Sequence, residues 1–184
     1  MNEKIFFFFN DLAGENALLD KLMVFGGVNL IYLMFLVAGV IVAYALYKRE
    51  YYRAGLFVAV LALTFVLLQL LAFTHVNERP YIEYDVTQLV EREPSRSFPS
   101  NHAGAAFAIA LGSIFITKPK AALALLLAAV AVGTSRIFTG LHHPIDIGGS
   151  ILAAAVALAG IYAGDRFLTH RQAKSDTKTE PYQD

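Results

Sequence analysis

The sequence predicts an all-α protein, a polytopic transmembrane helical bundle of about five spans preceded by an N-terminal interfacial helix. Two observations predict this class. Hydrophobic residues make up 57% of the 184 residues and charged residues only 16%, which is too apolar for an ordinary soluble domain of this size. The apolar residues also gather in runs whose lengths approach the roughly 20 residues that a helix needs to cross a bilayer core.

These runs give the following elements in chain order. Acidic residues interrupt the first segment, residues 1–23, and no small-residue cleavage site follows it, so we expect an interfacial helix rather than a cleaved signal. Of the apolar runs that come after it, two are shorter than a span and borrow length from their flanks. The expected spans are Asn29–Tyr47, Ala54–Thr74, Ala103–Thr117, Ala121–Thr134 and Pro144–Ala163.

The segment after Phe167 differs from the rest of the chain in composition. It is polar and contains few hydrophobic residues, which is typical of disordered chain. We therefore expect residues 1–167 to form a single integral-membrane domain and residues 168–184 to form a disordered tail.

The positive charges favour one orientation in the membrane. Five spans put the two ends of the chain on opposite sides, and nine of the 15 lysine and arginine residues fall on the side of the tail. Because loops rich in lysine and arginine stay on the cytoplasmic side, we expect a multi-pass protein of the cell (plasma) membrane with a cytoplasmic C-terminus. The nine residues are Lys48, Arg49, Arg53, Lys118, Lys120, Arg166, Arg171, Lys174 and Lys178.

Polar side chains gather at one end of the expected bundle. The link TKPK, residues 117–120, is so short that the third and fourth spans must form an antiparallel hairpin. The far ends of this hairpin carry FPSNH, residues 98–102, and SRIFTGLHHPID, residues 135–146, while HVNERP, residues 75–80, ends the second span on the same side. Three polar clusters therefore converge on one face, which the charge distribution places outside.

Two arginines and a serine in these clusters form a candidate anion site. Arg79 and Arg136 carry forked guanidinium groups that match phosphate oxygens, and Ser100 precedes a span whose first backbone amides can also bind an anion. Taken singly, Arg79 has the alternative role of a snorkelling anchor and Ser100 that of a helix N-cap. Together they indicate a phosphate site.

Histidines and a carboxylate lie in the same clusters. A histidine held by a carboxylate such as Asp146 is a competent nucleophile or base, and a second histidine can protonate a leaving oxygen. With the anion site, this set indicates cleavage of a phosphate ester or a diphosphate. The competing interpretation is a zinc site built from His102, His142, His143 and Asp146. Two neighbouring arginines would repel a divalent cation, and the sequence contains no cysteine ligand.

The three clusters resemble the signature of the type 2 phosphatidic acid phosphatase superfamily, written K-x6-R-P, P-S-G-H and S-R-x5-H-x3-D. The third part is complete from Ser135 to Asp146, with both gaps of the right length. The second part appears as Pro99–His102, with Asn101 in place of the glycine. The first part keeps R-P at residues 79–80, but Ala72 stands where the family has lysine, which removes one cationic phosphate ligand.

The resemblance implies a role for each matching residue, and neither a metal nor another cofactor. His142 corresponds to the nucleophile that forms a phosphohistidine, Asp146 to the carboxylate that holds its ring, and His102 to the general acid for the leaving group. The implied phosphate ligands are Arg79, Arg136 and Ser100, and the residues expected to line the pocket are Asn101, Ser135 and His143.

Within the superfamily, the short chain and the E-R-P of the first motif resemble the bacitracin-resistance type of undecaprenyl pyrophosphate phosphatase. That resemblance implies hydrolysis of undecaprenyl diphosphate to undecaprenyl phosphate on the outer face of the membrane, in carrier-lipid recycling for cell-wall synthesis. The expected partners are the lipid phosphate or diphosphate substrate and membrane lipids. The formal net charge of zero gives no case for a nucleic-acid partner, and no obligate protein partner is expected.

Two alternatives stay open. The same chemistry would serve phosphatidylglycerol phosphate or phosphatidic acid. An interpretation of another class is a non-catalytic bundle or a small transporter, although the five short spans show no evident inverted repeat. Turnover that depends on His142 would exclude this second alternative.

Overall fold

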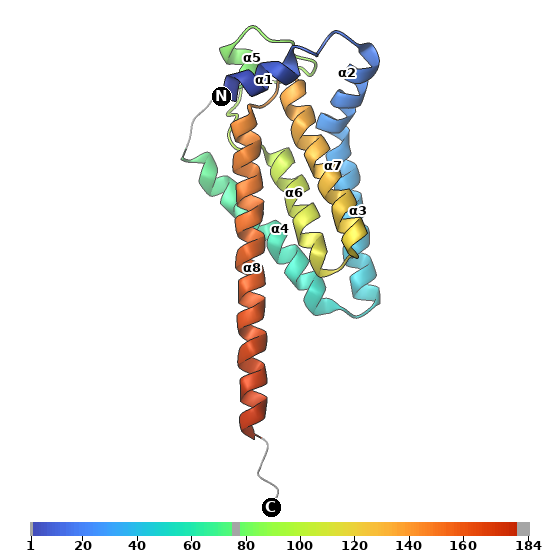
Figure 1. Cartoon of the computed structure of the whole chain (residues 1–184), viewed down its shortest axis with the longest axis vertical. Helices are drawn as coiled ribbons and strands as arrows, with labels where there is room; N and C mark the ends of the chain where they lie inside the picture. Colours follow the sequence, from blue (N-terminus) through green and yellow to red (C-terminus); the bar gives the residue numbers. More distant parts are fainter. Residues whose placement is uncertain (1, 75–77, 180–184) are drawn as a thin grey trace, which may run out of the picture.

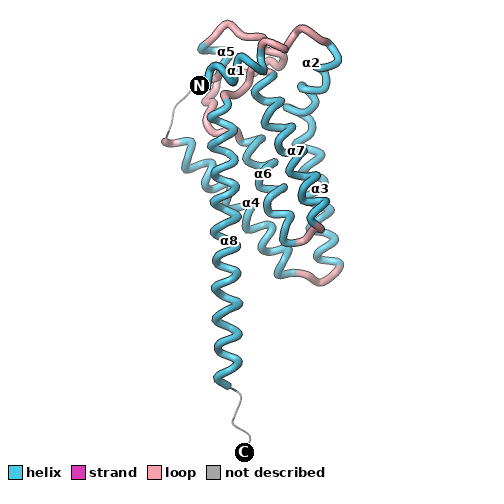
Figure 2. Tube along the Cα trace, viewed as in Figure 1, coloured by secondary structure: helices cyan, strands magenta, loops and turns pink. Residues whose placement is uncertain are grey.

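The described part of the chain is built from helices alone. This computed structural model describes residues 2–74 and 78–179, and no strand occurs among them (Figure 2). The all-α, multi-span class predicted from the sequence is confirmed. The third expected span is a shorter apolar helix, Asn101–Phe115. The helical stretches long and apolar enough to cross a membrane are Ala17–Tyr47, Tyr51–Ala72, Pro119–Phe138 and Pro144–Arg171.

Figure 1 shows the long helices side by side, with α1 and α5 lying across one end of the bundle and α8 extending far beyond the other. A π-helical turn, Phe25–Asn29, joins α2 to α3, and a 3₁₀ turn, Ser113–Phe115, follows α6. The α-helices are α1 Asn2–Asn10, α2 Ala17–Val24, α3 Leu30–Tyr47, α4 Tyr51–Ala72, α5 Pro80–Glu83, α6 Asn101–Gly112, α7 Pro119–Phe138 and α8 Pro144–Thr179.

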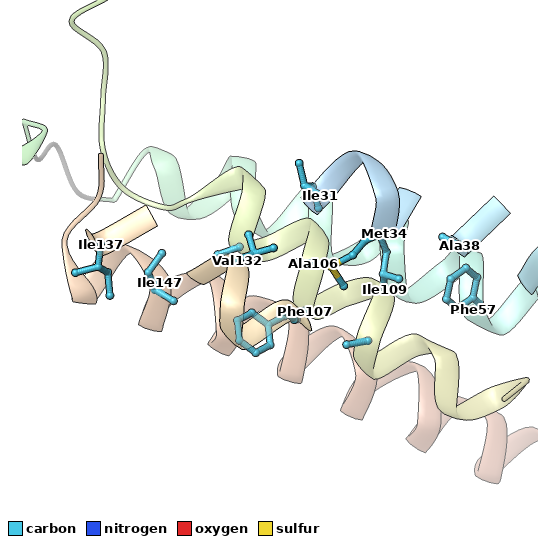
Figure 3. Close-up of a cluster of buried hydrophobic side chains, with 14 of the residues drawn as sticks. Ile31, Met34, Ala38, Phe57, Ala106, Phe107, Ile109, Val132, Ile137 and Ile147 are labelled. Atoms are coloured by element: carbon cyan, nitrogen blue, oxygen red, sulfur yellow. The ribbon is translucent and has the colours of Figure 1, made fainter. Parts of the chain in front are cut away.

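Helix α6 forms the centre of the packing, where it contacts α3, α4, α7 and α8. Its small residues let these neighbours approach closely, as is common between membrane helices. A Cβ atom on Gly104 would overlap the side chain of Leu68 on α4. Met34 of α3, Phe57 of α4 and Ala106 of α6 belong to one cluster of buried apolar side chains (Figure 3). Because α6 is surrounded, its first residues are held in a fixed position relative to α7 and α8.

The N-terminal segment contains two helices where one interfacial helix was expected. Gly14 separates them with a positive φ of 86°, a conformation that glycine adopts at no steric cost. Asn16 then begins α2, because its side chain accepts hydrogen bonds from two amides of the first turn. Since α2 runs through the π-helical turn into α3, the first candidate span begins at Ala17 rather than at Asn29.

Two later boundaries also differ from expectation. Helix α7 runs four residues beyond the expected end at Thr134, so Arg136 lies in its last turn instead of in a loop. Helix α8 continues to Thr179, through most of the segment expected to be disordered. This segment is rich in good helix formers, and neither glycine nor proline interrupts it between Gly164 and Pro181. The division into a domain at 1–167 and a tail stays a prediction, and residues 180–184 lie outside the described part.

The chain between α5 and α6 crosses the end of the bundle without regular structure. Asn10, at the end of α1, fastens this segment to α7. Its Nδ2 donates hydrogen bonds of 2.9 Å to the carbonyl oxygens of both Thr87 and Phe138, and its Oδ1 accepts one of 3.1 Å from the amide of Thr87. The expected polar cluster at 75–80 is described only from Glu78 onward.

Candidate active site

The turn between α7 and α8 places the polar residues of the third motif. Gly140 has a positive φ of 76°, and the amides of Leu141 and His142 turn back to bond the carbonyl oxygen of Arg136 at 3.1 and 3.2 Å. A glycine in this conformation is a common helix ending. Pro144 then starts α8, because its fixed φ suits the first helical position. The sequence T-G-L-H-H-P thus folds into a tight turn that presents His142.

His142 and Asp146 form the centre of the site. Nδ1 of His142 lies 3.2 Å from Oδ2 of Asp146, and both side chains are buried, at 3% and 0% exposure. The spacing of four residues across the start of α8 brings the two together. This contact assigns the ring proton of neutral His142 to Nδ1 and leaves Nε2 with a free lone pair. Such a histidine is built to act as a nucleophile at Nε2.

The carboxylate of Asp146 is held by two further donors. Its Oδ2 accepts hydrogen bonds from the hydroxyl of Ser97 and, at 2.9 Å, from the amide of His143. Its Oδ1 has no hydrogen-bond partner among the described residues. Donors to the ionised form stabilise a buried carboxylate, so Asp146 is prepared to balance a positive charge that develops on His142.

Arg79 brings a guanidinium group directly onto the ring of His142. Its Nη1 lies 3.3 Å from Nε2 of His142 and 3.0 Å from the carbonyl oxygen of Leu141, and its Nε donates to the hydroxyl of Ser95 at 2.9 Å. Burial lowers the pKa of Arg79 from its ordinary value, but an arginine stays charged at neutral pH. The site therefore contains a fixed positive charge beside Nε2 of His142.

Arg136 supplies a second buried guanidinium, with only 1% of its surface exposed. Its Nη1 donates to the carbonyl oxygen of Gly27, in the π-helical turn, at 3.0 Å, whereas its Nε has no partner among the described residues. Its charge acts on His142 together with that of Arg79. A buried cation without a carboxylate partner is costly, and an anionic ligand would remove that cost.

The pKa of His142 falls to about 3, mainly because the ring is buried and because the charges of Arg136 and Arg79 oppose protonation. The hydrogen bond to Asp146 acts in the opposite direction and does not outweigh them. The imidazole is therefore neutral at physiological pH. A neutral ring keeps the Nε2 lone pair that nucleophilic attack requires.

The start of α6 brings the second motif to the same place. Ser100 is the N-cap of α6, and its hydroxyl lies 3.5 Å from the amide of Ala103. The amide of Ser100 donates to the carbonyl oxygen of Asp146 at 3.3 Å. Oγ of Ser150 lies 2.8 Å from the carbonyl oxygens of both Ser100 and Asp146. These contacts join the starts of α6 and α8, and they therefore hold the second and third motifs in a fixed relative position.

His102 and Asn101 follow Ser100 and border an apolar cavity. The cavity measures about 260 Å³ and is also lined by aromatic residues of α3 and α4, including Tyr32, Phe35 and Phe65. His102 is only partly buried. Its ring therefore borders an apolar space and also feels the charges of Arg136, Arg92 and Arg79.

The side chains of two residues expected to line the pocket, Ser135 and His143, contact other partners. The hydroxyl of Ser135 contacts the sulfur of Met23 at 3.4 Å and packs against the π-helical turn, where a Cβ atom on Gly26 would overlap it. His143 is 2% exposed and lies 3.3 Å from the carboxylate of Glu83, in poor alignment for a hydrogen bond.

Three contacting residues escaped the sequence analysis. Ser95 and Ser97 bond Arg79 and Asp146, and Asn10 fastens the segment that carries both serines. No motif marks them, because they lie in an irregular segment and at the end of a short helix. The sequence marks only Asn10, as a polar residue at the end of the phenylalanine-rich first helix.

Comparison with known proteins agrees with the motifs. A protein of Bacillus licheniformis named bacitracin transport permease protein BcrC is 33% identical over 162 residues, which cover 86% of this chain and 78% of that protein. The undecaprenyl-diphosphatase BcrC of Bacillus subtilis (strain 168) is 28% identical over 165 residues, which cover 85% of this chain and 80% of that protein.

The fold has a counterpart among solved structures. The crystal structure of Aquifex aeolicus LpxE matches with a TM-score of 0.72 and 24% identity, over 88% of this chain and 94% of that one. At this level of identity the likeness concerns the fold alone. Residues 53–168 match the PAP2 superfamily, a range that contains Arg79, His102, His142 and Asp146. The match covers most of the chain and the whole of this cluster, and the chain belongs to the PAP2 superfamily.

Proposed function

We propose that the protein is a membrane lipid phosphatase that hydrolyses undecaprenyl diphosphate to undecaprenyl phosphate and inorganic phosphate through a phosphohistidine. The observation that carries the proposal is the arrangement around His142. Its Nδ1 is held by Asp146 at 3.2 Å, and its Nε2 lies 3.3 Å from Nη1 of Arg79. A nucleophile that already contacts a phosphate-binding guanidinium is suited to phosphoryl transfer.

The reaction takes place in two steps. In the first, Nε2 of His142 attacks the terminal phosphorus, the bond from phosphorus to the bridging oxygen breaks, and His102 donates a proton to that oxygen. In the second, water attacks the phosphohistidine, the phosphorus–nitrogen bond breaks, and His102 takes a proton from the water. Asp146 balances the positive charge of the phosphorylated ring, because its Oδ2 faces Nδ1 throughout.

Charge stabilisation provides much of the rate. The transferred phosphoryl group spreads negative charge over its three equatorial oxygens, and the guanidinium groups of Arg79 and Arg136 supply donors for them. Both side chains are held in advance, by Ser95 and Leu141 in one case and by Gly27 in the other. Donors fixed before the reaction need no reorganisation in the transition state.

The apolar cavities beside His102 support a lipid substrate. A second cavity of about 140 Å³ adjoins the first and shares Phe35, Phe65 and Asn101 with it. A hydrocarbon chain in this space would bring the oxygen that leaves with the lipid next to His102. The name of the Bacillus subtilis relative, an undecaprenyl-diphosphatase, supports a C55 prenyl chain over two acyl chains.

We also propose the membrane in which the protein resides and the side on which its site lies. The site lies at the end of the bundle away from the basic residues of α8, so the positive-inside rule supports a cell membrane protein with its site on the outer side and its C-terminus in the cytoplasm. Labelling a single cysteine introduced at Arg96 with a membrane-impermeant maleimide, in intact cells, tests this. Labelling only after the cells are broken would overturn the orientation.

The activity is tested by phosphate release from undecaprenyl diphosphate by detergent-purified protein in the presence of a chelator. We expect release by the wild type and by His170→Ala, an exposed histidine on α8, and none by His142→Ala. Release that needs an added metal ion, or that survives in His142→Ala, would overturn the mechanism. Release only from phosphatidylglycerol phosphate or phosphatidic acid would keep the mechanism and replace the substrate.

A second candidate comes from the name of the Bacillus licheniformis relative, a bacitracin transport permease protein. A transporter of another class would need no nucleophile, and the His142–Asp146 pair would then be a structural contact. Bacitracin efflux from vesicles by His142→Ala at the wild-type rate, with no phosphate released by either protein, would favour this candidate.

A further inference from the structure

A third arginine lies near the two buried ones, in the irregular segment that precedes α6. Alternate residues of this segment are fastened to the site. The carbonyl oxygen of Glu93 accepts a hydrogen bond of 3.0 Å from the hydroxyl of Tyr81, Ser95 accepts one of 2.9 Å from Nε of Arg79, and Ser97 donates one to Asp146. Arg92 directly precedes these three contacts, so its backbone is held at the edge of the site.

The positive charge of Arg92 acts on Arg79, His102 and Arg136. It lowers the pKa of Arg79, after the larger effect of burial, and it acts on His102. The charges of Arg92 and Arg136 also act on each other. Three like charges that interact with one another are unfavourable unless an anion is bound between them. The arrangement therefore suits a ligand with more negative charge than two arginines would neutralise.

Arg92 is also free to bind a ligand. Its side chain is exposed and forms no hydrogen bond or ion pair with a described residue, although Glu91 and Glu93 flank it in sequence. Arg79 and Arg136 are buried and fixed by carbonyl and hydroxyl groups. The site thus has two buried guanidinium groups held by hydrogen bonds and one exposed guanidinium without such bonds.

The exposed guanidinium of Arg92 corresponds to the second phosphate of a diphosphate. Arg79 contacts Nε2 of His142 and the charge of Arg136 also acts on that ring, so in the proposed mechanism the terminal phosphate reacts beside these two. Arg92 acts on His102, which in the same mechanism protonates the oxygen that leaves with the lipid. We propose that Arg92 binds the phosphate that stays on the lipid, and that it thereby makes the site selective for lipid diphosphates over lipid monophosphates. This inference rests on the proposed function, since it deepens the choice of substrate at the same site.

Arg96 provides a matched control for Arg92. It carries the same charge in the same segment, is likewise exposed, and its side chain forms no hydrogen bond or ion pair with a described residue. The variants are Arg92→Ala, Arg92→Lys and Arg96→Ala, and the probes are inorganic diphosphate and orthophosphate as competitive inhibitors of phosphate release from undecaprenyl diphosphate. Neither anion carries a lipid chain, so the comparison measures how the site binds the phosphate groups alone.

We expect Arg92→Ala to weaken inhibition by inorganic diphosphate about tenfold or more, the loss typical of a charge-assisted hydrogen bond. Inhibition by orthophosphate should stay near the wild-type value, because Arg79 and Arg136 are intact. KM for undecaprenyl diphosphate should rise more than kcat falls. Arg92→Lys should recover part of the loss, and Arg96→Ala should resemble the wild type. The inference would be overturned if Arg92→Ala and Arg96→Ala had equal effects. It would also be overturned if Arg92→Ala weakened inhibition by inorganic diphosphate and by orthophosphate equally.

Calorimetric binding of the same two anions separates this inference from the proposed function. If the wild type releases no phosphate from any lipid, the proposed function fails, and the affinity for inorganic diphosphate still tests Arg92. Weaker binding in Arg92→Ala than in Arg96→Ala would then support a diphosphate site. Failure of the wild type to bind inorganic diphosphate more tightly than orthophosphate would overturn it.

Discussion

Nη1 of Arg79 lies 3.3 Å from Nε2 of His142, the ring nitrogen with the free lone pair. Because Nδ1 faces Asp146 at 3.2 Å, Nε2 accepts the hydrogen bond and Arg79 donates it. The proposed nucleophile and a proposed phosphate ligand thus contact each other directly. A phosphate that enters would take over the N–H of Arg79 and leave Nε2 free to attack, so binding and activation of the nucleophile are coupled.

Arg79→Lys tests this coupling. A lysine keeps the positive charge but loses the fork that reaches Ser95, Leu141 and His142 at once. We expect kcat to fall by about 10²–10³, the usual cost of losing one preorganised donor to a transition-state oxygen. Phosphate release at saturating substrate measures it, with the thermal unfolding temperature as a check on folding. A wild-type kcat in this variant would show that the charge alone suffices.

Asp146→Asn should impair the nucleophile without removing its neighbours. An amide can present its NH₂ group to Nδ1 and favour the wrong tautomer, and it does not balance the charge of the phosphohistidine. We expect a loss of roughly 10⁴ in kcat, as for the corresponding change in catalytic triads. Ser97→Ala is the matched control, because it removes one donor to the same Oδ2 and should cost about tenfold or less. Equal losses in the two variants would contradict an orienting role for the carboxylate.

The stability of the protein should fall as the pH is lowered, through His142. Burial and two arginines lower the pKa of His142 to about 3 in the folded protein, whereas a histidine in the unfolded chain has a pKa of about 6.5. The unfolded state therefore binds more protons between these values, and the free energy of unfolding decreases as the pH falls through that window. The decrease is measured by thermal unfolding in detergent at pH 7 and pH 4.5. A His142→Gln variant should lose less stability between these two pH values than the wild type. An equal loss in both proteins would contradict the assignment of the effect to His142.

The spans and the motif residues could be predicted from the sequence because both follow simple rules. Apolar runs of sufficient length must be helical in a membrane, and the fixed gaps between Arg136, His142 and Asp146 required these residues to meet at the turn before α8. The hairpin of α6 and α7 then brought His102 to the same end.

The remaining contacts depend on features that hydropathy does not record. Ser95 and Ser97 lie in a segment without periodicity, and their partners are known only once that segment is fastened by Asn10. Ser135 matches the motif, yet its hydroxyl faces Met23, because α7 continues as a helix past the expected end of the span. A motif fixes which residues occur, whereas the helix phase decides where each side chain points.

Two glycines near the site should respond to alanine in opposite ways. Gly140 has a φ of 76°, and a Cβ atom there would lie 3.1 Å from the carbonyl oxygen of Thr87. Gly140→Ala should therefore destabilise the protein by about 1–2 kcal/mol from the left-handed conformation alone, and it should lower kcat because the turn also carries His142. Gly148, in α8, has no atom within 4 Å of its Cβ position, so Gly148→Ala should be neutral or stabilise by up to about 1 kcal/mol.

The pair distinguishes backbone strain from a general intolerance of substitution near the site. Thermal unfolding in one detergent gives the stability of each variant, and phosphate release at saturating substrate gives its kcat. If the turn is strained by a side chain, the unfolding temperature and kcat decrease together in Gly140→Ala and neither decreases in Gly148→Ala. Parallel decreases in both variants would instead mean that the start of α8 tolerates no added methyl group, and the special role of Gly140 in presenting His142 would be lost.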